Sequence, residues 1–334
     1  METKQITSKK IWEDFLLKSN QPSFLQSWYW GEFHQSLDHK IFRLGFYKDQ
    51  KLIGLALIIK IKAKRGTYLE CPAGPVIPWS KNHLAFFKKT ITKLAKQEKA
   101  LFLRLRSNIL ADPQNTSILQ QLGFIKSPMH LHAQTTLLLD LNKSEEDLLA
   151  NMKKNTRYDI KKAQKLGVKV TTSTNPKDID TLYQLQLETV TRKNFVPFSK
   201  TYLKNQLAIF KPDNKIQLFK ASYKGQVLAI SFIIFYGQEA VYHYSGSSNQ
   251  HRNIPASYAL QWQAIKKAKA LGFKHYNFWG YTNNPKHRFF GPSLFKKGFG
   301  GYQVDYMPAH DLPLSFWYWP IYLFETFRRK LRRL

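Results

Sequence analysis

The chain has 334 residues, of which 43% are hydrophobic and 15% aromatic, enough for a packed core and for two domains. Lysine and arginine number 52 against 22 acidic residues, and the formal net charge of +30 predicts a polyanionic partner: nucleic acid, an anionic membrane surface or a phosphorylated substrate. The single cysteine, Cys71, excludes an intramolecular disulfide and a thiolate metal cluster. A basic surface without a specific partner remains the alternative.

Two further absences bear on location. The N-terminal residues METKQITSKKIWEDF lack the apolar core of a signal peptide, and no apolar run approaches the roughly 20 residues of a membrane span. We therefore expect a cytoplasmic protein.

Residues 45–76 begin with a short strand, turn at a Lys-Asp step, continue in the apolar run LIGLALII and end in a third strand that carries aromatic residues. The amphipathic helix AFFKKTITKLAKQEKA and the strand LFLRLR follow. This order predicts a mixed α/β layer in which the last strand returns parallel to the third through a right-handed connection.

Residues 144–167 predict one helix. Ser144 can cap it, three acidic residues favour its N-terminal end, and Gly167 ends it. Its later turns are rich in cations, and four of them are candidates for contact with nucleic-acid phosphates: Lys153, Lys154, Arg157 and Lys161. A solvated helix face is the competing interpretation.

Residues 219–248 repeat the pattern of residues 45–76 at a nearly constant offset, and a helix, ASYALQWQAIKKAKALG, and a strand, FKHYNFWG, again follow. The repeated unit has the element order of an acyl-CoA-dependent N-acetyltransferase. Those enzymes hold the CoA pyrophosphate on a glycine-rich loop before the central helix. Here the corresponding loops, residues 78–82 and 250–256, contain no glycine, so we expect a different acyl donor.

Near the C-terminus, residues 294–301 read LFKKGFGG, and we expect a basic, glycine-hinged loop that is not a Walker loop. Residues 312–334 combine a cluster of aromatic residues with a basic end, FRRKLRRL. Such a tail suits attachment to the surface of an anionic membrane, and a helix that completes a domain core is the equal alternative.

The sequence resembles the Fem family of aminoacyl-tRNA-dependent, peptidoglycan bridge-forming transferases. The stretches that carry the resemblance occur in family order across nearly the whole chain: QSWYWGEFH, CPAGPVI, NMKKNTRYDIKKAQKLGVKV, ETVTRKNFVPFSKTYL, YHYSGSSNQHRNIPASYALQW, GFKHYNFWG and FKKGFGGYQVDY. The resemblance implies two tandem acetyltransferase-like domains, which we place at residues 1–142 and 143–304. A C-terminal segment, residues 305–334, would return to the first domain, and there is no room for the coiled-coil arm of some members.

The resemblance also implies a reaction: transfer of an amino acid from its tRNA ester to the stem-peptide amine of a lipid-linked or nucleotide-linked peptidoglycan precursor. Aminoacyl-tRNA would be the co-substrate, and no cofactor or metal is expected. Aminolysis of an ester requires a neutral amine, alignment and stabilisation of an oxyanion. The chain contains neither G-x-S-x-G nor H-E-x-x-H, so we expect direct attack rather than covalent catalysis.

The family match assigns candidate roles. Lys296 would stabilise the oxyanion, and Phe295 would stack on the terminal adenine. Arg192 would bind the phosphates of the precursor, and Tyr244 would line the acceptor cleft. On spacing alone, a surface lysine in a flexible loop is the preferred interpretation of Lys296, and a strand-core aromatic residue is an equal alternative for Tyr244.

Other positions depart from the family. His34 stands where the family has a phosphate-binding lysine, and Asn277 replaces an aspartate, so neither offers the expected charge. We keep His34 among the substrate-binding candidates, together with Arg252 in the glycine-free loop. Two alternatives stay open: another acyltransferase on the same scaffold, and a basic protein that binds tRNA or a membrane surface without catalysis.

Overall fold

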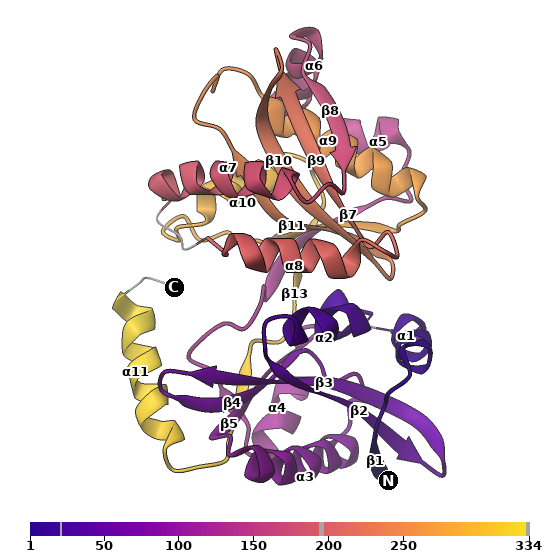
Figure 1. Ribbon diagram of the computed structural model, residues 1–334, viewed down its shortest axis with the longest axis vertical. Helices are drawn as coiled ribbons and strands as arrows, with labels where there is room; N and C mark the ends of the chain where they lie inside the picture. Colours follow the sequence, from indigo (N-terminus) through magenta and orange to yellow (C-terminus); the bar gives the residue numbers. More distant parts are fainter. Residues whose placement is uncertain (21, 194–196, 332–334) are drawn as a thin grey trace. The chain divides into compact units, whose positions relative to one another are not determined.

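The computed structural model describes residues 1–20, 22–193 and 197–331, the side chains of residues 190–193 excepted (Figure 1). The chain forms two units: Met1–Gln134 with Asp305–Leu334, and Thr135–Val304. No helix within the described ranges is long and apolar enough to cross a bilayer.

The first unit contains, in the part of the chain that is described, a sheet of order β1-β2-β3-β4-β5-β14-β6. Its elements are β1 (Glu2–Gln5), α1 (Lys9–Lys18), η1 (Phe24–Gln26), α2 (Trp28–Gln35), β2 (Lys40–Lys48), β3 (Lys51–Ala63), β4 (Gly66–Ala73), α3 (Lys81–Glu98), β5 (Phe102–Ser107), α4 (Pro113–Gln121), β6 (Ile125–Lys126), β14 (His310–Pro313) and α11 (Tyr318–Leu331). Helix α3 buries the apolar stripe of Leu84, Phe87, Ile91 and Ala95 in the core of this unit.

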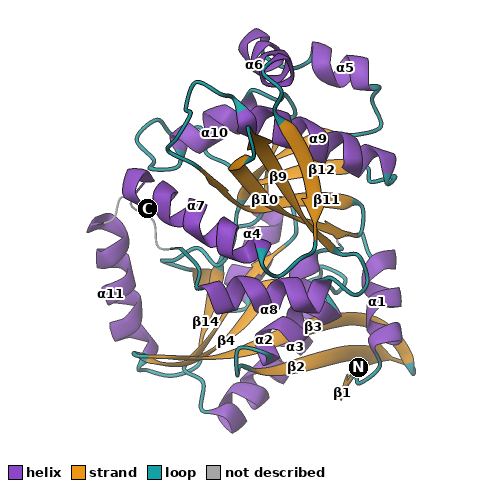
Figure 2. Ribbon diagram, turned by 45° about the horizontal axis from the view of Figure 1, so that its top comes forward, coloured by secondary structure: helices purple, strands orange, loops and turns teal. Residues whose placement is uncertain are grey.

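The second unit is built around a sheet of order β13-β7-β12-β11-β10-β9-β8. Its elements are β7 (Thr135–Asp140), α5 (Glu145–Ala150), α6 (Lys154–Lys165), β8 (Lys169–Ser173), α7 (Asp178–Lys193), α8 (Lys200–Phe210), β9 (Ile216–Tyr223), β10 (Gln226–Tyr236), β11 (Glu239–Ser247), α9 (Ala256–Ala270), β12 (His275–Gly280), α10 (Phe290–Lys297) and β13 (Tyr302–Asp305). Helix α9 covers one face of the sheet, and α7 and α8 lie on the other (Figure 2).

The predicted repeat is present in both units, as β2-β3-β4-α3-β5 and as β9-β10-β11-α9-β12. In each, the first three strands pair antiparallel and the strand after the helix pairs parallel to the third. The mixed α/β fold class is therefore confirmed.

The boundary between the units differs from the predicted one at residue 142. Strand β7 pairs antiparallel with β12 of the second sheet, with Leu139 opposite Tyr276. Residues 135–142 therefore belong to the second unit, because their apolar strand completes its sheet.

The helix predicted over residues 144–167 is interrupted. It forms α5 and α6, and the guanidinium of Arg157 donates a hydrogen bond to the carbonyl oxygen of Ala150 at 3.1 Å and another to that of Met152. These bonds satisfy carbonyl groups that the end of α5 leaves free. The backbone N–H of Lys153 bonds to the carbonyl oxygen of Gly298 at 2.9 Å, which holds the break against the chain that follows α10.

The stretch LFKKGFGG, predicted as a loop, begins as helix: Leu294–Lys297 is the last turn of α10, and Gly298 caps it. Gly300 and Gly301 then take φ of +87° and +88°, in the region that favours glycine. A Cβ on Gly301 would lie 2.4 Å from the carbonyl oxygen of Leu138 on β7. The glycines thus let the chain leave α10 and pass close to the backbone of β7.

This contact predicts a stability difference between two glycines of similar φ. Gly225 has φ +82° in the turn between β9 and β10, with open space around it, so Gly225→Ala should cost about 1 kcal/mol. Gly301→Ala adds a clash with a backbone oxygen and should cost a further ~2 kcal/mol or more. Urea denaturation of the two variants measures the difference, and equal unfolding free energies would contradict the clash.

Candidate active site

The two parallel strands at the centre of the second unit, β11 and β12, separate after a few residue pairs. Strands β11 and β12 pair only from Glu239↔His275 to Val241↔Asn277. Beyond these pairs, β11 continues to Ser247 and β12 to Gly280 without a shared register. In the first unit, by contrast, β4 and β5 stay paired from Leu69↔Leu103 to Ala73↔Ser107. The opening therefore belongs to the second unit.

Asn277 fixes the point of separation. Its Oδ1 accepts hydrogen bonds from Thr136 Oγ1 and, at 2.8 Å, from the backbone N–H of Trp279, while its Nδ2 donates to Glu239 Oε2 at 2.8 Å. Trp279 has φ +61°, so β12 is irregular where it leaves β11. Asn277 is only 3% exposed and joins the strands through both ends of its amide, and an aspartate at this position could not donate the bond to Glu239.

A cavity of about 300 Å³ lies in this part of the second unit. Its wall combines hydroxyl and amide side chains with one aromatic ring from α10: Thr189, Ser231, Tyr242, Ser245, Ser247, Ser257, Gln261 and Phe295. Ser231 is 1% exposed, and its Oγ has no hydrogen-bond partner among the described residues. A buried hydroxyl in that state offers a bond to a ligand.

Helix α10 places two side chains at this opening. Phe295 lines the cavity and packs edge-on against Tyr258 of α9, with ring centroids 4.9 Å apart. Ser293 ties the helix to the chain after β12, because its Oγ accepts a hydrogen bond from the N–H of Thr282 at 3.0 Å. Lys296 therefore reaches the end of β12, where its Nζ donates to the carbonyl oxygen of Gly280 at 2.5 Å.

Among the described residues, no acidic side chain offsets the charge of the Lys296 amine. Its Nζ lies 5.9 Å from the centre of the Tyr242 ring, and burial lowers the pKa of the amine from 10.5 to about 7. Lys296 is thus neither a fixed cation nor a solvated surface lysine. It is a partly buried amine that changes charge close to neutral pH.

Tyr244 lies on the other face of the sheet from the cavity. The pairing of β10 with β11 shifts at Phe232/Ile233, so Tyr244 faces Phe232 and Tyr242 faces Ile233, with His243 as the extra residue. Tyr244 consequently packs on α8, its hydroxyl 3.4 Å from that of Tyr202.

The same bulge leaves His243 fully desolvated. Its ring lies 5.4 Å from that of Trp279, and burial lowers the pKa of its imidazole to about 3. His243 is therefore neutral at physiological pH.

The loop before α9 is held by a carboxylate of the chain itself. Glu188 of α7 accepts a hydrogen bond from the backbone N–H of Asn249 at 2.6 Å and from the hydroxyl of Ser248 at 3.1 Å. These two donors are therefore already used within the chain. Arg252, predicted to bind substrate, is exposed in this loop and bonds to Asn249 Oδ1 at 3.1 Å.

The remaining predicted site residues are spread over both units. His34 is 8% exposed in the first unit, its Nδ1 2.9 Å from that of His39, and burial lowers its pKa to about 3, so it offers no cation to a phosphate. Lys153, Lys154 and Lys161 are exposed at α6, whereas Arg157 is engaged in capping α5. The side chain of Arg192 lies outside the described residues.

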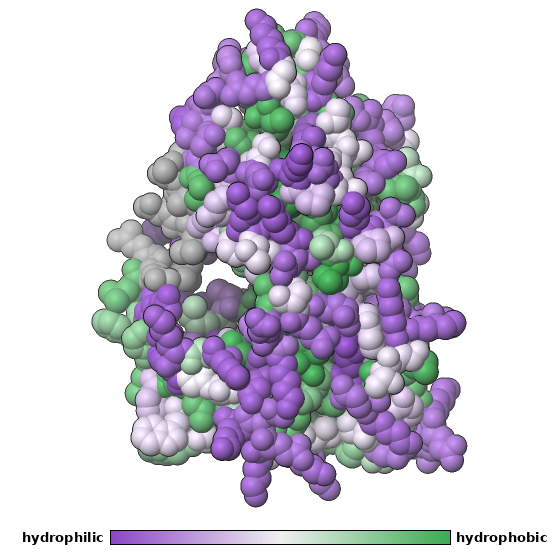
Figure 3. All heavy atoms as spheres, in the orientation of Figure 1, coloured by the Kyte–Doolittle hydropathy of each residue, from purple (hydrophilic) through white to green (hydrophobic). Residues whose placement is uncertain are grey.

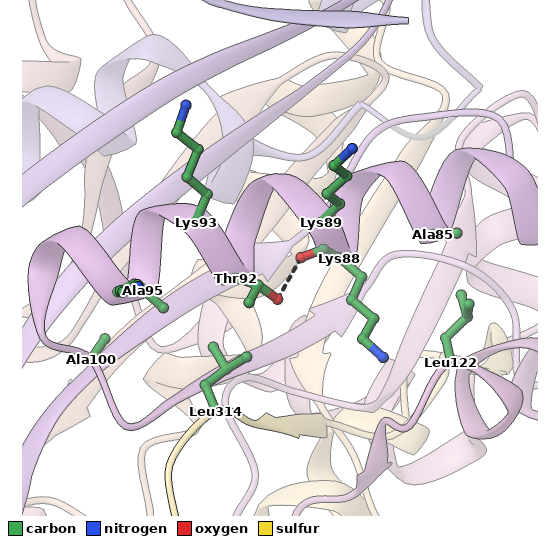
Figure 4. A pocket seen from close by; sticks show the side chains of 10 residues that line it. Ala85, Lys88, Lys89, Thr92, Lys93, Ala95, Ala100, Leu122 and Leu314 are labelled. Atoms are coloured by element: carbon green, nitrogen blue, oxygen red, sulfur yellow. Dashed lines mark hydrogen bonds between the residues drawn. The ribbon is translucent and has the colours of Figure 1, made fainter.

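The first unit has a hollow of its own. A hollow of about 720 Å³ in the first unit is lined by lysines from α3, Lys88, Lys89, Lys93 and Lys96, beside Leu122 and Leu314 (Figure 4). Within the described ranges, no cluster of three or more His, Cys, Asp or Glu side chains is suited to a metal.

Sequence reasoning missed Ser231, Tyr242 and Glu188. Ser231 and Tyr242 sit within apolar strand patterns, and Glu188 sits within a helix. Their positions become evident only from the packing of β10, β11 and α7, which places Ser231 and Tyr242 in the cavity wall and Glu188 at the loop before α9.

Comparisons with known proteins agree with this architecture. A crystal structure of FemX superposes with a TM-score of 0.85 at 19% identity, covering 97% of this chain and 99% of that chain. A tandem GNAT protein from the clavulanic acid biosynthesis pathway superposes with a TM-score of 0.59 at 11% identity, covering 94% and 98%. Two tandem acetyltransferase-like units, opened at the parallel strands of the second, define the fold class.

The amino-acid sequence identifies the family to which the chain belongs within this fold. It matches the FemAB family over residues 7–224 and 214–324. A lipid II:glycine glycyltransferase from Staphylococcus saprophyticus is 22% identical over 411 residues, covering 100% of this chain and 97% of the relative. The aminoacyltransferase FemA of Staphylococcus epidermidis is 25% identical over 372 residues, covering 85% and 88%. The chain belongs to the FemAB family, as its resemblance predicted.

The lowered pKa of Lys296 predicts a pH-dependent stability. Below pH 7 the amine is protonated in the folded and the unfolded chain; between about pH 7 and 10.5 only the unfolded chain binds the proton. Stability should therefore rise with pH across that window, by at most ~1.4 kcal/mol per unit, and Lys296→Met should lack this contribution.

Urea denaturation at several pH values measures this difference. Lys297→Met, which removes an exposed lysine from the same helix, is the control. If wild type and Lys296→Met show parallel curves between pH 7 and 10, the amine is not desolvated.

Proposed function

We propose that this protein transfers an amino acid from aminoacyl-tRNA to the stem-peptide amine of a peptidoglycan precursor. The observation that carries the proposal is Lys296, a desolvated amine held at the point where β11 and β12 separate, beside a cavity lined by Phe295. The activities that name the relatives, glycyl transfer to lipid II and aminoacyl transfer, support a reaction of this type.

The donor end fits the cavity in size and chemistry. A space of about 300 Å³ accommodates a nucleoside or an aminoacyl group, and the ring of Phe295 offers a surface on which a base can stack. The unpartnered Ser231 hydroxyl then forms a hydrogen bond with the bound group. The net charge of +30 favours a polyanionic donor.

The reaction is a direct aminolysis. The neutral stem-peptide amine attacks the ester carbonyl carbon, a C–N bond forms, the C–O bond to the ribose breaks, and the proton lost by the amine replaces the acyl group on the ribose oxygen. Protonated Lys296 donates a hydrogen bond to the carbonyl oxygen as negative charge develops on it. Because the pKa of Lys296 is about 7, its ammonium form is more acidic than that of an ordinary lysine and a stronger donor.

The acceptor is the less defined substrate. Arg192 and Tyr244 stay predictions for its binding, and Tyr244 lies across the sheet from the cavity, next to Phe198 and Tyr202 of the α8 region. An acceptor that touches Tyr244 therefore approaches from the α8 face.

A transfer assay with charged tRNA and lipid-linked or nucleotide-linked precursor tests the proposal. Lys296→Met should reduce the transfer rate about 100-fold or more while tRNA binding is retained, since an oxyanion donor is lost. Lys297→Met should transfer like wild type. Wild-type activity in Lys296→Met would refute the lysine mechanism, and no amino-acid mass increment on any acceptor would refute the function.

The pH profile distinguishes a cation from a base. Because the acceptor amine must be neutral, its own deprotonation raises the rate with pH. If the ammonium form of Lys296 is required, that rise should level off above the pKa of Lys296 in the substrate complex. Lys296→Arg stays charged, so its rate should keep rising over the same range even if it is lower throughout. A wild-type rate that keeps rising above that pKa, together with inactive Lys296→Arg, would instead make Lys296 a general base.

A further inference from the structure

Helix α11 is fixed to the first unit by one of its faces. Tyr318 is fully buried and donates its hydroxyl hydrogen to Asp311 Oδ2 at 2.9 Å. Arg104 of β5 bonds to Asp311 at 2.8 Å and also to Glu325 of α11 at 2.7 Å. With Ile321 only 8% exposed, the inner face of the helix is set by a buried ion network and two core side chains.

The opposite face of α11 is apolar and open. Its residues recur at helical spacing, and Phe316 and Trp317 of the preceding turn extend the same face. They are among the most exposed large apolar side chains of the described chain: Phe316 80%, Leu323 67%, Phe327 63% and Leu331 68%, with Trp317 68%, Trp319 45% and Phe324 45% beside them. We call these residues the outer face of α11. A soluble monomer rarely exposes so many neighbouring apolar groups without a partner.

Cations border the outer face. The guanidinium of Arg65 lies 4.2 Å from the centre of the Phe324 ring, and Arg328 and Lys330 flank Phe327 on α11. Glu325, the single acidic residue between 314 and 331, is turned inward to Arg104. A groove of about 420 Å³ opens beside the face and is lined by Arg65, Leu101, Trp317, Pro320, Ile321 and Phe324. Figure 3 shows hydrophobic and hydrophilic side chains together where α11 lies in Figure 1.

We propose that the outer face of α11 docks on the surface of an anionic lipid bilayer. Aromatic and leucine side chains enter the headgroup and upper acyl region, while Arg65, Arg328 and Lys330 contact lipid phosphates. Docking on such a bilayer needs apolar side chains that enter it and cations that contact its phosphates. The outer face of α11 carries the apolar side chains, and the cations border it.

Charge argues against a second copy of the chain as the occupant. A symmetric pair of outer faces would bring the cations of both copies together, and no acidic side chain of α11 is available to compensate them. A bilayer rich in acidic lipid presents negative charge over the whole area instead.

Docking has a consequence that rests on the proposed function. A protein held at the bilayer meets a lipid-linked precursor at high local concentration, so the lipid-linked form becomes the favoured acceptor. A water-soluble, nucleotide-linked precursor gains nothing from the contact.

Co-sedimentation with vesicles tests the docking without any assay of transfer. The full chain should bind vesicles of phosphatidylglycerol and phosphatidylcholine and should bind pure phosphatidylcholine vesicles much more weakly. Leu323→Ser with Phe327→Ser should weaken binding by about tenfold or more, because two exposed apolar groups no longer enter the bilayer. Leu110→Ser with Leu271→Ser removes side chains that are 61% and 50% exposed elsewhere and should bind like wild type.

Three results would overturn the proposal: no binding of wild type to the acidic vesicles, equal binding by the α11 double variant, or a dimer in light scattering that the same variant dissociates. In a transfer assay, the α11 variant should lose activity on vesicle-embedded lipid-linked precursor and keep it on the nucleotide-linked one. If wild type transfers to neither, the proposed function fails, and the vesicle result still stands alone.

Discussion

The separation of β11 from β12 is the constraint on which the candidate site depends. Three residue pairs join these strands, and Asn277 then anchors β7, β11 and the irregular end of β12 together through its amide. Where the strands separate, backbone groups lose their ladder partners and a space opens between the strands. Side chains of α10 lie at this space. The bond from Lys296 to the carbonyl oxygen of Gly280 satisfies one such group, so the feature that opens the sheet also positions the amine.

The two units share one architecture and differ in whether their central parallel strands separate. In the first unit the parallel strands remain paired over five positions, and the apolar side chains between them and α3 are closely packed. In the second unit the corresponding strands part, and the space is lined by hydroxyl groups. The first unit instead carries α11, held by the Arg104–Asp311–Glu325 network, and its hollow of about 720 Å³ is lined by α3 rather than by its parallel strands. The two units therefore share a strand order and differ in where they are hollowed.

The sequence predicts the repeated strand and helix order well because turn residues and apolar runs mark each element in both halves. It places β7 in the wrong unit, since an apolar strand does not indicate which of two sheets it will join. It predicts a loop where α10 ends, because three glycines conceal one turn of helix. The site is less predictable. Lys296 and Phe295 come from the family resemblance, whereas the pKa of Lys296 depends on burial, and the position of Tyr244 depends on a one-residue bulge at His243 that no alternation of residues reveals.

Glu188 bears on which anions the loop before α9 can hold. Its carboxylate accepts hydrogen bonds from the Ser248 hydroxyl and the Asn249 N–H, so these two donors are already used within the chain. A pyrophosphate at this loop would have to displace the carboxylate from both groups. The donors of a loop before a helix can thus be taken by a side chain from a neighbouring helix instead of by a bound anion.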